Sequence, residues 1–280
     1  MRLGLHLPQF RAGAALAGAE LTEAAAAAEE AGADDLWVSD HLLLPAGSDS
    51  PPTDFHDPLT VLTWAAAATH RVGLGTSVLV APYRHPVALA KTLASLDALS
   101  GGRAIAGPAS GWSESEFAAL GVPFRRRGAL TDTAIAVCRA LWAGREDVHI
   151  GPHDLRGMRL APGPARPGGP AVWIGGNSPA GIGRAVRLGD GWHTTTSTPE
   201  RLARRLEGLD AALVAAGRTR DDSDLTLSVR VRADAPAVAL LAPALAGLGV
   251  HHVLVDPPRW TGVEAFAREA GSLRAALDAA

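Results

Sequence analysis

The sequence has little of what a secreted or membrane-bound protein needs. Cys138 is the single cysteine among 280 residues, so no intrachain disulfide can form. No apolar run reaches the roughly 18 residues that cross a bilayer. Met1 leads directly into a strand-like segment, without the basic and apolar regions of a secretory signal. We therefore expect a cytoplasmic protein in a reducing compartment, with no membrane partner.

Several kinds of functional site are also missing. The net charge is −3 and the basic residues are scattered, so we expect no nucleic-acid partner. Lys91, the only lysine, lies in a helix-like stretch, which argues against a Schiff-base lysine. The histidines lack metal-ligand spacing, and we expect no metal. No G-x-G-x-x-G follows the first strand, which weakens a Rossmann interpretation, and no G-x-S-x-G indicates a hydrolase.

What is present is a regular alternation of strand-like and helix-like segments along the whole chain. The predicted strands are Arg2–Pro8, Asp35–Ser39, Val72–Val80, Arg103–Gly107, Val172–Gly175, Gly191–Thr194, Leu225–Arg232 and His252–Val255. The predicted helices are Glu20–Ala31, Pro58–Thr69, Pro86–Leu99, Glu114–Leu120, Ala129–Ala143, Pro179–Leu188, Pro199–Ala216, Pro236–Leu248 and Val263–Leu277.

Eight strands that are each followed by a helix require parallel pairing with right-handed crossovers. The simplest closed solution is one α/β domain over residues 1–280, a (β/α)8 TIM barrel with insertions. An open doubly wound sheet is the alternative that periodicity leaves open. Two long segments, Asp40–Asp57 and Arg145–Pro170, exceed a minimal barrel, and the second is expected to hold a small hairpin or excursion.

The functional site of such a barrel lies at the carboxyl ends of its strands. Asp40 and His41 follow the second strand, where a carboxylate beside an imidazole can tune a pKa and move a proton. On spacing alone, a capping aspartate next to a partly exposed histidine is the favoured explanation of this pair, because adjacent Asp and His are common in loops. Further residues fall at strand ends: Gln9, Ser77 to Val80, Ser110, Gly111, Trp112, His193, Thr194, Arg230, Arg232 and Asp256.

The N-termini of two predicted helices are candidate anion-binding sites. The run from Gly175 through Gly176 and Asn177 to Pro179 ends a strand and opens a helix, a geometry that binds phosphate. A tight turn with an N-cap and proline at the first helical position is the structural alternative. Near the other start, Ser113 and Glu116 have the spacing of a capping box. The residues alone therefore predict a barrel with one anionic-ligand site and name no reaction.

At these residues the chain resembles the luciferase-like flavin and deazaflavin oxidoreductases. The resemblance runs from Leu3 to about Pro257 and rests on ordered motifs, which are GLHLPQF, GADDLWVSDHLLLP, VGLGTSVLVAPYRHPVALAKTLASLDALSGGR, SGWSESEFAALGVPFRRRGALTDTAIAVCRALW, VWIGGNSPAGIGRAVRLGDGWH and HHVLVDPP. Each motif alone is weak, and the set in this order is specific. The resemblance implies the barrel fold, with the cofactor ring at the carboxyl ends of the strands.

Details of these motifs resemble the branch that uses the deazaflavin coenzyme F-420. This resemblance implies that His41 exchanges a proton near the ring, with Asp40 orienting it or contacting the ring. It implies a cis peptide between Ser77 and Val78 that supports the ring's back face. The cofactor phosphate would lie at Gly175, Gly176 and Asn177, with Ser110, Gly111 and Ser115 nearby. Gln9, Trp112 and His193 would line the substrate pocket.

The resemblance therefore implies an F-420-dependent oxidoreductase that transfers a hydride between the deazaflavin and a small organic substrate. Relatives that act on sugar phosphates carry a catalytic glutamate where this chain has Trp112, which disfavours glucose-6-phosphate. The alternatives are an FMN-dependent two-component monooxygenase supplied by a flavin reductase, and a non-catalytic flavin-binding barrel. Relatives are usually dimers, so a homodimer is expected.

Overall fold

Parallel strands close into a barrel at the centre of the protein. The computed structural model describes residues 1–11, 14–46, 54–196, 198–256 and 262–279. Within these ranges the barrel strands, each hydrogen-bonded to the next around the circle, are β1 (Arg2–His6), β4 (Asp35–Val38), β5 (Gly73–Thr76), β7 (Ala104–Ala106), β11 (Ala171–Gly175), β12 (Gly191–Thr195), β13 (Thr226–Arg232) and β14 (His252–Asp256). This confirms the predicted (β/α)8 barrel and excludes the open sheet.

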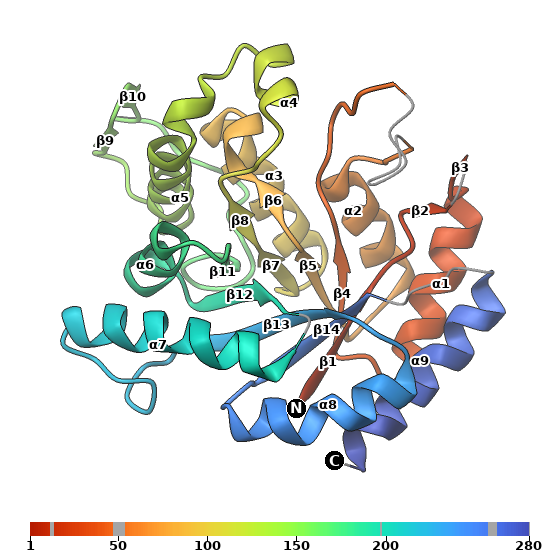
Figure 1. The fold of residues 1–280 in the computed structure, drawn as a ribbon. Helices are drawn as coiled ribbons and strands as arrows, with labels where there is room; N and C mark the ends of the chain where they lie inside the picture. The colour runs from red at the N-terminus through yellow and green to blue at the C-terminus, as the bar shows by residue number, and fades with distance from the viewer. Residues whose placement is uncertain (12–13, 47–53, 197, 257–261, 280) are drawn as a thin grey trace.

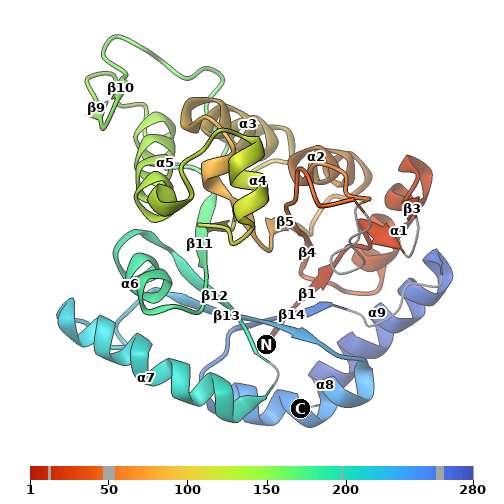
Figure 2. The ribbon, with the colours of Figure 1, turned by 45° about the horizontal axis from the view of Figure 1, so that its top comes forward.

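A ring of helices covers the outside of the barrel (Figures 1 and 2). Each helix packs on the next in chain order, and the last closes on the first. The helices of this ring are α1 (Gly18–Glu30), α2 (Pro58–Ala68), α3 (Pro86–Leu99), α5 (Arg127–Trp142), α6 (Pro179–Leu188), α7 (Pro199–Ala215), α8 (Ala235–Gly247) and α9 (Val263–Asp278). The main hydrophobic core lies between this ring and the strands, and most of its buried side chains are Leu, Val, Ile and Ala.

Proline and a preceding cap residue fix the starts of several helices. Proline occupies the first helical turn of α2, α6 and α7, where its missing N–H leaves no hydrogen bond unmade. Asp57, Ser178 and Thr198 precede these helices, and their side chains accept the free backbone N–H groups of the first turn. These local rules explain why sequence alone locates the helix starts closely.

The predicted third strand is interrupted. The segment expected as one strand, Val72–Val80, divides at a cis peptide between Ser77 and Val78, as the family resemblance implied. Beyond it, β6 (Leu79–Val80) leaves the barrel and pairs with β8 (Pro108–Ala109), next to the mouth of the barrel. The expectation of a continuous strand was wrong, because the chain turns out of the barrel circle after Thr76.

The remaining elements lie at the edges of the barrel. The segment Arg145–Pro170 contains the short hairpin β9 (His149–Ile150) and β10 (His153–Asp154), which confirms the predicted excursion and projects from the barrel in Figure 2. Strands β2 (Phe10–Arg11) and β3 (Ala14–Ala15) form a hairpin that the sequence did not predict. The 3-10 turns η1 (Ala81–Tyr83) and η2 (Phe124–Arg126) and helix α4 (Glu114–Ala119) complete the elements. Part of the loop Asp40–Asp57, residues 47–53, lies outside the described residues.

Candidate functional site

A cavity of about 720 Å³ opens at the carboxyl ends of the barrel strands. This volume is typical of sites for cofactors and small molecules. The structure brings together most of the predicted site residues in its wall, namely Asp40, His41, Ser77, Val78, Ser110, Gly111, Trp112, Gly175, Gly176, Asn177 and His193. The residues that follow strands scattered along the sequence therefore meet in one place, as the barrel rule predicts.

His41 is held in the cavity wall by a buried carboxylate. Its Nδ1 lies 2.9 Å from Oε2 of Glu116, whose other oxygen accepts the backbone N–H groups of Leu42 and Leu43 at 2.8 and 3.2 Å. Burial alone would raise the pKa of Glu116, but the hydrogen bonds from His41 and from these backbone groups outweigh it and hold the pKa below its ordinary value. The carboxylate therefore keeps the His41 proton on Nδ1.

The second nitrogen of His41 remains available for chemistry. Among the described residues, Nε2 of His41 has no hydrogen-bond partner, although the ring lines the cavity. The edges of Phe55 and Trp112 meet the ring, with centroids 5.2 and 5.7 Å away. A neutral imidazole with Nδ1 protonated accepts a proton at Nε2 and returns it from there. The surroundings of His41 therefore suit proton exchange with an apolar-faced ligand.

Glu116 is a candidate site residue whose partner the sequence interpretation missed. The capping-box prediction is half right: the hydroxyl of Ser113 accepts the N–H of Glu116, at 3.4 Å. The carboxylate of Glu116 turns the other way, toward His41 and the hydroxyl of Tyr83, which donates to it at 3.1 Å. Burial followed by the Glu116 charge raises the pKa of Tyr83, so its hydroxyl stays protonated as a donor.

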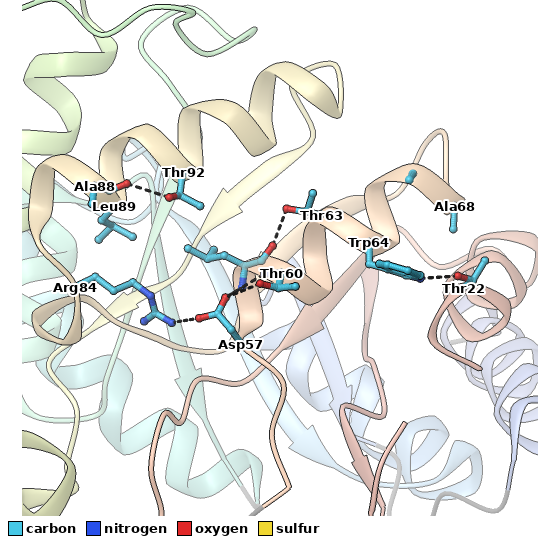
Figure 3. A pocket seen from close by; sticks show the side chains of 12 residues that line it. Thr22, Asp57, Thr60, Thr63, Trp64, Ala68, Arg84, Ala88, Leu89 and Thr92 are labelled. Atoms are coloured by element: carbon cyan, nitrogen blue, oxygen red, sulfur yellow. Dashed lines mark hydrogen bonds and ion pairs between the residues drawn. The ribbon is translucent and has the colours of Figure 1, made fainter. Parts of the chain in front are cut away.

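Among the described residues, the hydrogen bonds of Asp40 join it to Arg84 and Val80 and not to His41. Its carboxylate accepts two hydrogen bonds from the guanidinium of Arg84, at 2.6 and 3.0 Å, and one from the backbone N–H of Val80, at 2.8 Å. Arg84 in turn binds Asp57 at 2.6 Å (Figure 3). These bonds fix Asp40 against β6, and its expected role as orienter of His41 or contact of the cofactor ring stays a prediction.

The segment around the cis peptide is hydrogen-bonded to an arginine that is distant in the sequence. The guanidinium of Arg230, on β13, donates to the carbonyl oxygen of Ser77 at 2.8 Å. A second nitrogen of Arg230 binds Asp256 at 2.8 Å. Burial would raise the pKa of Asp256, but the charges of His6 and Arg230 outweigh it and keep the pKa low. The backbone at Ser77 is therefore anchored independently of any ligand.

The glycine-rich turn after β11 forms one wall of the cavity. A Cβ at position 175 would overlap the side chain of Val78, so only glycine leaves room there. Gly176 has a φ of 134°, which an L side chain rarely adopts. The side chain of Asn177 is tied to β12, because its amide donates to the hydroxyl of Thr195 at 2.8 Å. A ligand at this turn therefore meets backbone N–H groups at the start of α6.

Positive charge gathers at this end of the cavity. Arg125, Arg127 and Arg184 line it, together with Gly128 and Ser178. Arg184 is nearly buried and pairs with Asp132. Together with the positive end of α6, these guanidinium groups suit an anionic group such as a phosphate. The sequence interpretation did not select these arginines, because they lie on helices and loops that only the fold brings to the cavity.

Two predicted site residues lie outside the cavity wall. Gln9 is fully buried, and its side chain bonds the backbone N–H and carbonyl of Ser39, the latter at 3.0 Å. Ser115 faces the exposed side of α4, and its hydroxyl lies 3.1 Å from that of Ser113. Gln9 thus supports the segment before Asp40, and Ser115 belongs to the cap of a helix. Both assignments to a ligand contact find no support in the cavity wall.

Within the described ranges no group of three or more His, Cys, Asp or Glu side chains is arranged to hold a metal ion. Likewise, the helices in the described part of the chain include none that is long and apolar enough to cross a membrane.

Comparison with known protein families identifies the family to which the chain belongs. Residues 1–279 match the luciferase-like monooxygenase family. The chain belongs to this family. Its relatives include an F-420-dependent glucose-6-phosphate dehydrogenase of Kineococcus radiotolerans, 33% identical over 79% of this chain and 66% of the relative. A protein of the same name from Beutenbergia cavernae is 35% identical over 74% of this chain and 62% of the relative. The chain thus spans slightly less than two thirds of these relatives.

Solved structures support the fold of this luciferase-like protein. An F-420-dependent secondary alcohol dehydrogenase in complex with an F-420–acetone adduct superimposes with a TM-score of 0.79 at 17% identity, over 99% of this chain and 98% of that one. A monooxygenase from Streptomyces bottropensis gives a TM-score of 0.75 at 22% identity, over 100% of this chain and 99% of that one. At these identities the likeness establishes the shared barrel.

Proposed function

We propose that this luciferase-like chain is an oxidoreductase that uses coenzyme F-420 and transfers a hydride between the deazaflavin and a small organic molecule. The observation that carries the proposal is His41, seated in the cavity wall with Nδ1 bound to Glu116 and Nε2 available. Relatives at 33% and 35% identity are named as F-420-dependent dehydrogenases, which favours F-420 over FMN. A cavity-lining imidazole backed by a buried carboxylate favours an enzyme over a non-catalytic flavin-binding barrel.

The cavity has the shape and charge that the cofactor requires. Val78 lies against Gly175, where a Cβ would close the space, and forms a firm wall for a flat ring. Arg125, Arg127 and Arg184 balance the negative charge of a phosphate-bearing tail at the start of α6. When bound, the deazaflavin supplies hydride chemistry at a ring carbon and does not readily activate oxygen. The chain's residues would bind and orient it and exclude water.

His41 would exchange the proton that accompanies hydride transfer at the substrate. Glu116 keeps the ring in one tautomer, so Nε2 presents a lone pair to an alcohol or, once protonated, a donor to a carbonyl. Phe55 and Trp112 flank the imidazole and favour a substrate with an apolar face. With Trp112 in place of an acidic residue, we propose a small alcohol, carbonyl or alkene in preference to a sugar phosphate.

Equilibrium titration of the purified protein with F-420 and with FMN tests the cofactor. We expect saturable F-420 binding and weak FMN binding. Tight binding of reduced FMN without F-420 binding would instead indicate a monooxygenase that depends on a partner reductase. His41→Ala would abolish turnover of an identified substrate and retain F-420 binding. A variant that binds and turns over like the wild type would contradict the catalytic role of His41.

We also propose that the chain forms a homodimer through the outer face of α2 and α3. A groove of about 860 Å³ lies over these helices, lined by alanine, leucine, threonine and Trp64 side chains and by the ion pair of Arg84 and Asp57 (Figure 3). Helix α2 contains no charged residue, and Trp64 on it is 53% exposed. The two charged side chains in the lining, Arg84 and Asp57, pair with each other, so two copies can meet there without burying an unpaired charge. These features favour a second copy of the chain as the occupant.

Light scattering after gel filtration measures the oligomeric state. We expect a dimer for the wild type and a monomer for Ala67→Arg, since a buried unpaired guanidinium would oppose association. Ala211→Arg, on the exposed face of α7, is the matched control and should stay dimeric. A monomeric wild type would contradict the proposal. The single domain over residues 1–280 and the cytoplasmic location stay predictions.

A further inference from the structure

A chain of hydrogen-bonded polar side chains runs through the inside of the barrel. Nε2 of His252 lies 2.7 Å from Oδ1 of Asp35, and Nδ1 of His252 lies 2.7 Å from Oγ of Ser228. Ser228 Oγ lies 2.8 Å from Nδ1 of His193, and Nε2 of His193 lies 2.8 Å from Oγ of Ser77. We call these residues the buried chain. None of them is more than 4% exposed.

Small residues on the barrel strands leave room for the buried chain inside the barrel. Interior layers of such barrels usually consist of branched aliphatic side chains. Here glycines on neighbouring strands make the space: a Cβ at Gly4 would lie 2.5 Å from Nε2 of His252, and one at Gly75 would lie 2.6 Å from Trp37. The Trp37 ring stacks on that of His193, with centroids 5.2 Å apart and planes 8° from parallel. Aromatic side chains therefore insulate the hydrogen bonds from water.

The two ends of the buried chain differ. At one end, Ser77 and His193 line the cavity. At the other, Asp35 accepts from Arg2 at 2.6 Å and from the indole N–H of Trp37 at 2.5 Å, besides His252. Burial would raise the pKa of Asp35, but the adjacent His252, the guanidinium of Arg2 and the hydrogen bonds outweigh it and hold the pKa low. The far end is thus a carboxylate that can balance a positive imidazole.

His193, which lies between Ser77 and Ser228 in the buried chain, stays neutral. Burial first, then the nearby His252 and Arg230, lowers its pKa to about 3. A neutral imidazole donates with one nitrogen while accepting with the other, so it passes a proton without storing charge. Besides Asp35 and Arg2, the charged or titratable groups that act on these rings are His6 and Arg230.

We propose that the buried chain is a proton relay between the cavity and the pair of Asp35 and His252. Reduction of a substrate by a dihydro cofactor moves one hydrogen as hydride and leaves another as a proton. His41 would exchange the proton of the substrate. The relay would take up or return the separate proton that accompanies oxidation or reduction of the cofactor. This inference rests on the proposed function, because hydride transfer creates the need for a second proton site.

The transfer balances at each link. With Nε2–H of a neutral His252 donating to Asp35, we assign the resting directions in turn: Ser228 donates to Nδ1 of His252, Nδ1–H of His193 donates to Ser228, and Ser77 donates to Nε2 of His193. When a proton enters at Ser77, each group passes its own proton onward. His252 ends as an imidazolium facing the Asp35 carboxylate, and His193 has exchanged one neutral tautomer for the other. Only N–H and O–H bonds change, and the reverse sequence returns the proton.

Ring-nitrogen NMR of the free protein tests the linkage without any cofactor. As the pH is lowered stepwise, we expect His193 to change tautomer from Nδ1–H to Nε2–H at the same step at which the His252 ring nitrogens report a second proton. Ser228→Ala removes the middle hydroxyl and should separate the two events. A single His193 tautomer throughout the titration, or the same coupled change in Ser228→Ala, would overturn the relay.

Turnover provides the second readout. We expect Ser228→Ala to lower kcat about 10- to 100-fold, to change the solvent deuterium isotope effect, and to leave the F-420 dissociation constant within about twofold. Ser228→Thr, which keeps a hydroxyl, should recover most of the rate. Thr69→Val removes a buried hydroxyl far from the cavity and controls for lost stability. Wild-type turnover in Ser228→Ala would refute the relay alone, whereas absent F-420 binding in the wild type would refute the proposed function.

Discussion

Glu116 places its carboxylate 2.9 Å from Nδ1 of His41, across 75 positions of sequence. The bond joins α4, which lies outside the barrel circle, to the loop after β4. A carboxylate behind a cavity-lining imidazole fixes its tautomer and stabilises the imidazolium that forms during proton transfer. The chemistry proposed for His41 therefore depends on a residue that does not itself line the cavity.

Replacement of Glu116 tests this positioning role. Glu116→Gln should lower kcat about 10- to 100-fold with little change in KM, because the amide no longer favours the Nδ1–H tautomer. The pH–rate profile should also change, because the ionised Glu116 carboxylate, whose pKa is held below its ordinary value, no longer lies beside His41. Glu114→Gln, on the exposed side of the same helix, is the matched control and should behave like the wild type. Equal profiles for both variants would refute the role.

The same pair predicts a pH dependence of stability. The pKa of Glu116 is depressed in the folded protein, so its stabilisation is present above the ordinary carboxyl pKa of about 4.3. It is lost as the pH falls through the depressed value. Denaturant unfolding of the wild type and Glu116→Gln should therefore show a difference that is largest near neutral pH and shrinks in acid. A difference independent of pH would contradict an ionised Glu116.

Arg184 and Arg187 provide a matched pair on α6 for the anion site. Both guanidinium groups bind Asp132, but only Arg184 lines the cavity. Arg184→Gln should weaken F-420 binding about tenfold, and the salt dependence of binding should decrease. Arg187→Gln should change the dissociation constant less than about twofold. Isothermal titration at two salt concentrations measures both effects, and equal weakening by the two variants would argue against a local phosphate contact.

Gly175 tests the wall formed by Val78. Gly175→Ala would force the Val78 side chain away from its place in the cavity wall, since the added Cβ overlaps it. We expect about 1–3 kcal/mol lower unfolding free energy and about tenfold weaker cofactor binding. Gly183→Ala, on α6 with its nearest atom 3.7 Å away, serves as the control. Unchanged binding by Gly175→Ala would show that this wall does not contact the ligand.

Local sequence rules predicted most of the fold. Helices α3 and α6 were located at their observed bounds, because proline marks their starts. The cis peptide between Ser77 and Val78 came from the family resemblance, and the structure has it. The break of the third strand and the β2–β3 hairpin were missed, since two-residue strands carry no periodic pattern.

The sequence predicted which residues lie at the candidate site, but it did not predict which side chains are hydrogen-bonded to one another there. Strand ends pointed to His41, Ser77 and Gly176, which the barrel brings into one cavity. Glu116 was interpreted as a helix cap, because a sequence displays neighbours three residues apart and hides a contact 75 residues away. The buried chain was invisible for the same reason: Asp35 and His252 are separated by 217 positions.

The most direct measurement is a crystal structure of the protein with F-420 bound. The account predicts the deazaflavin ring against Val78, its phosphate at the start of α6, and Nε2 of His41 within hydrogen-bond reach of a substrate placed over the ring. A ring bound outside this cavity, or an imidazole of His41 that has left Glu116 and turned from the ligand, would contradict it.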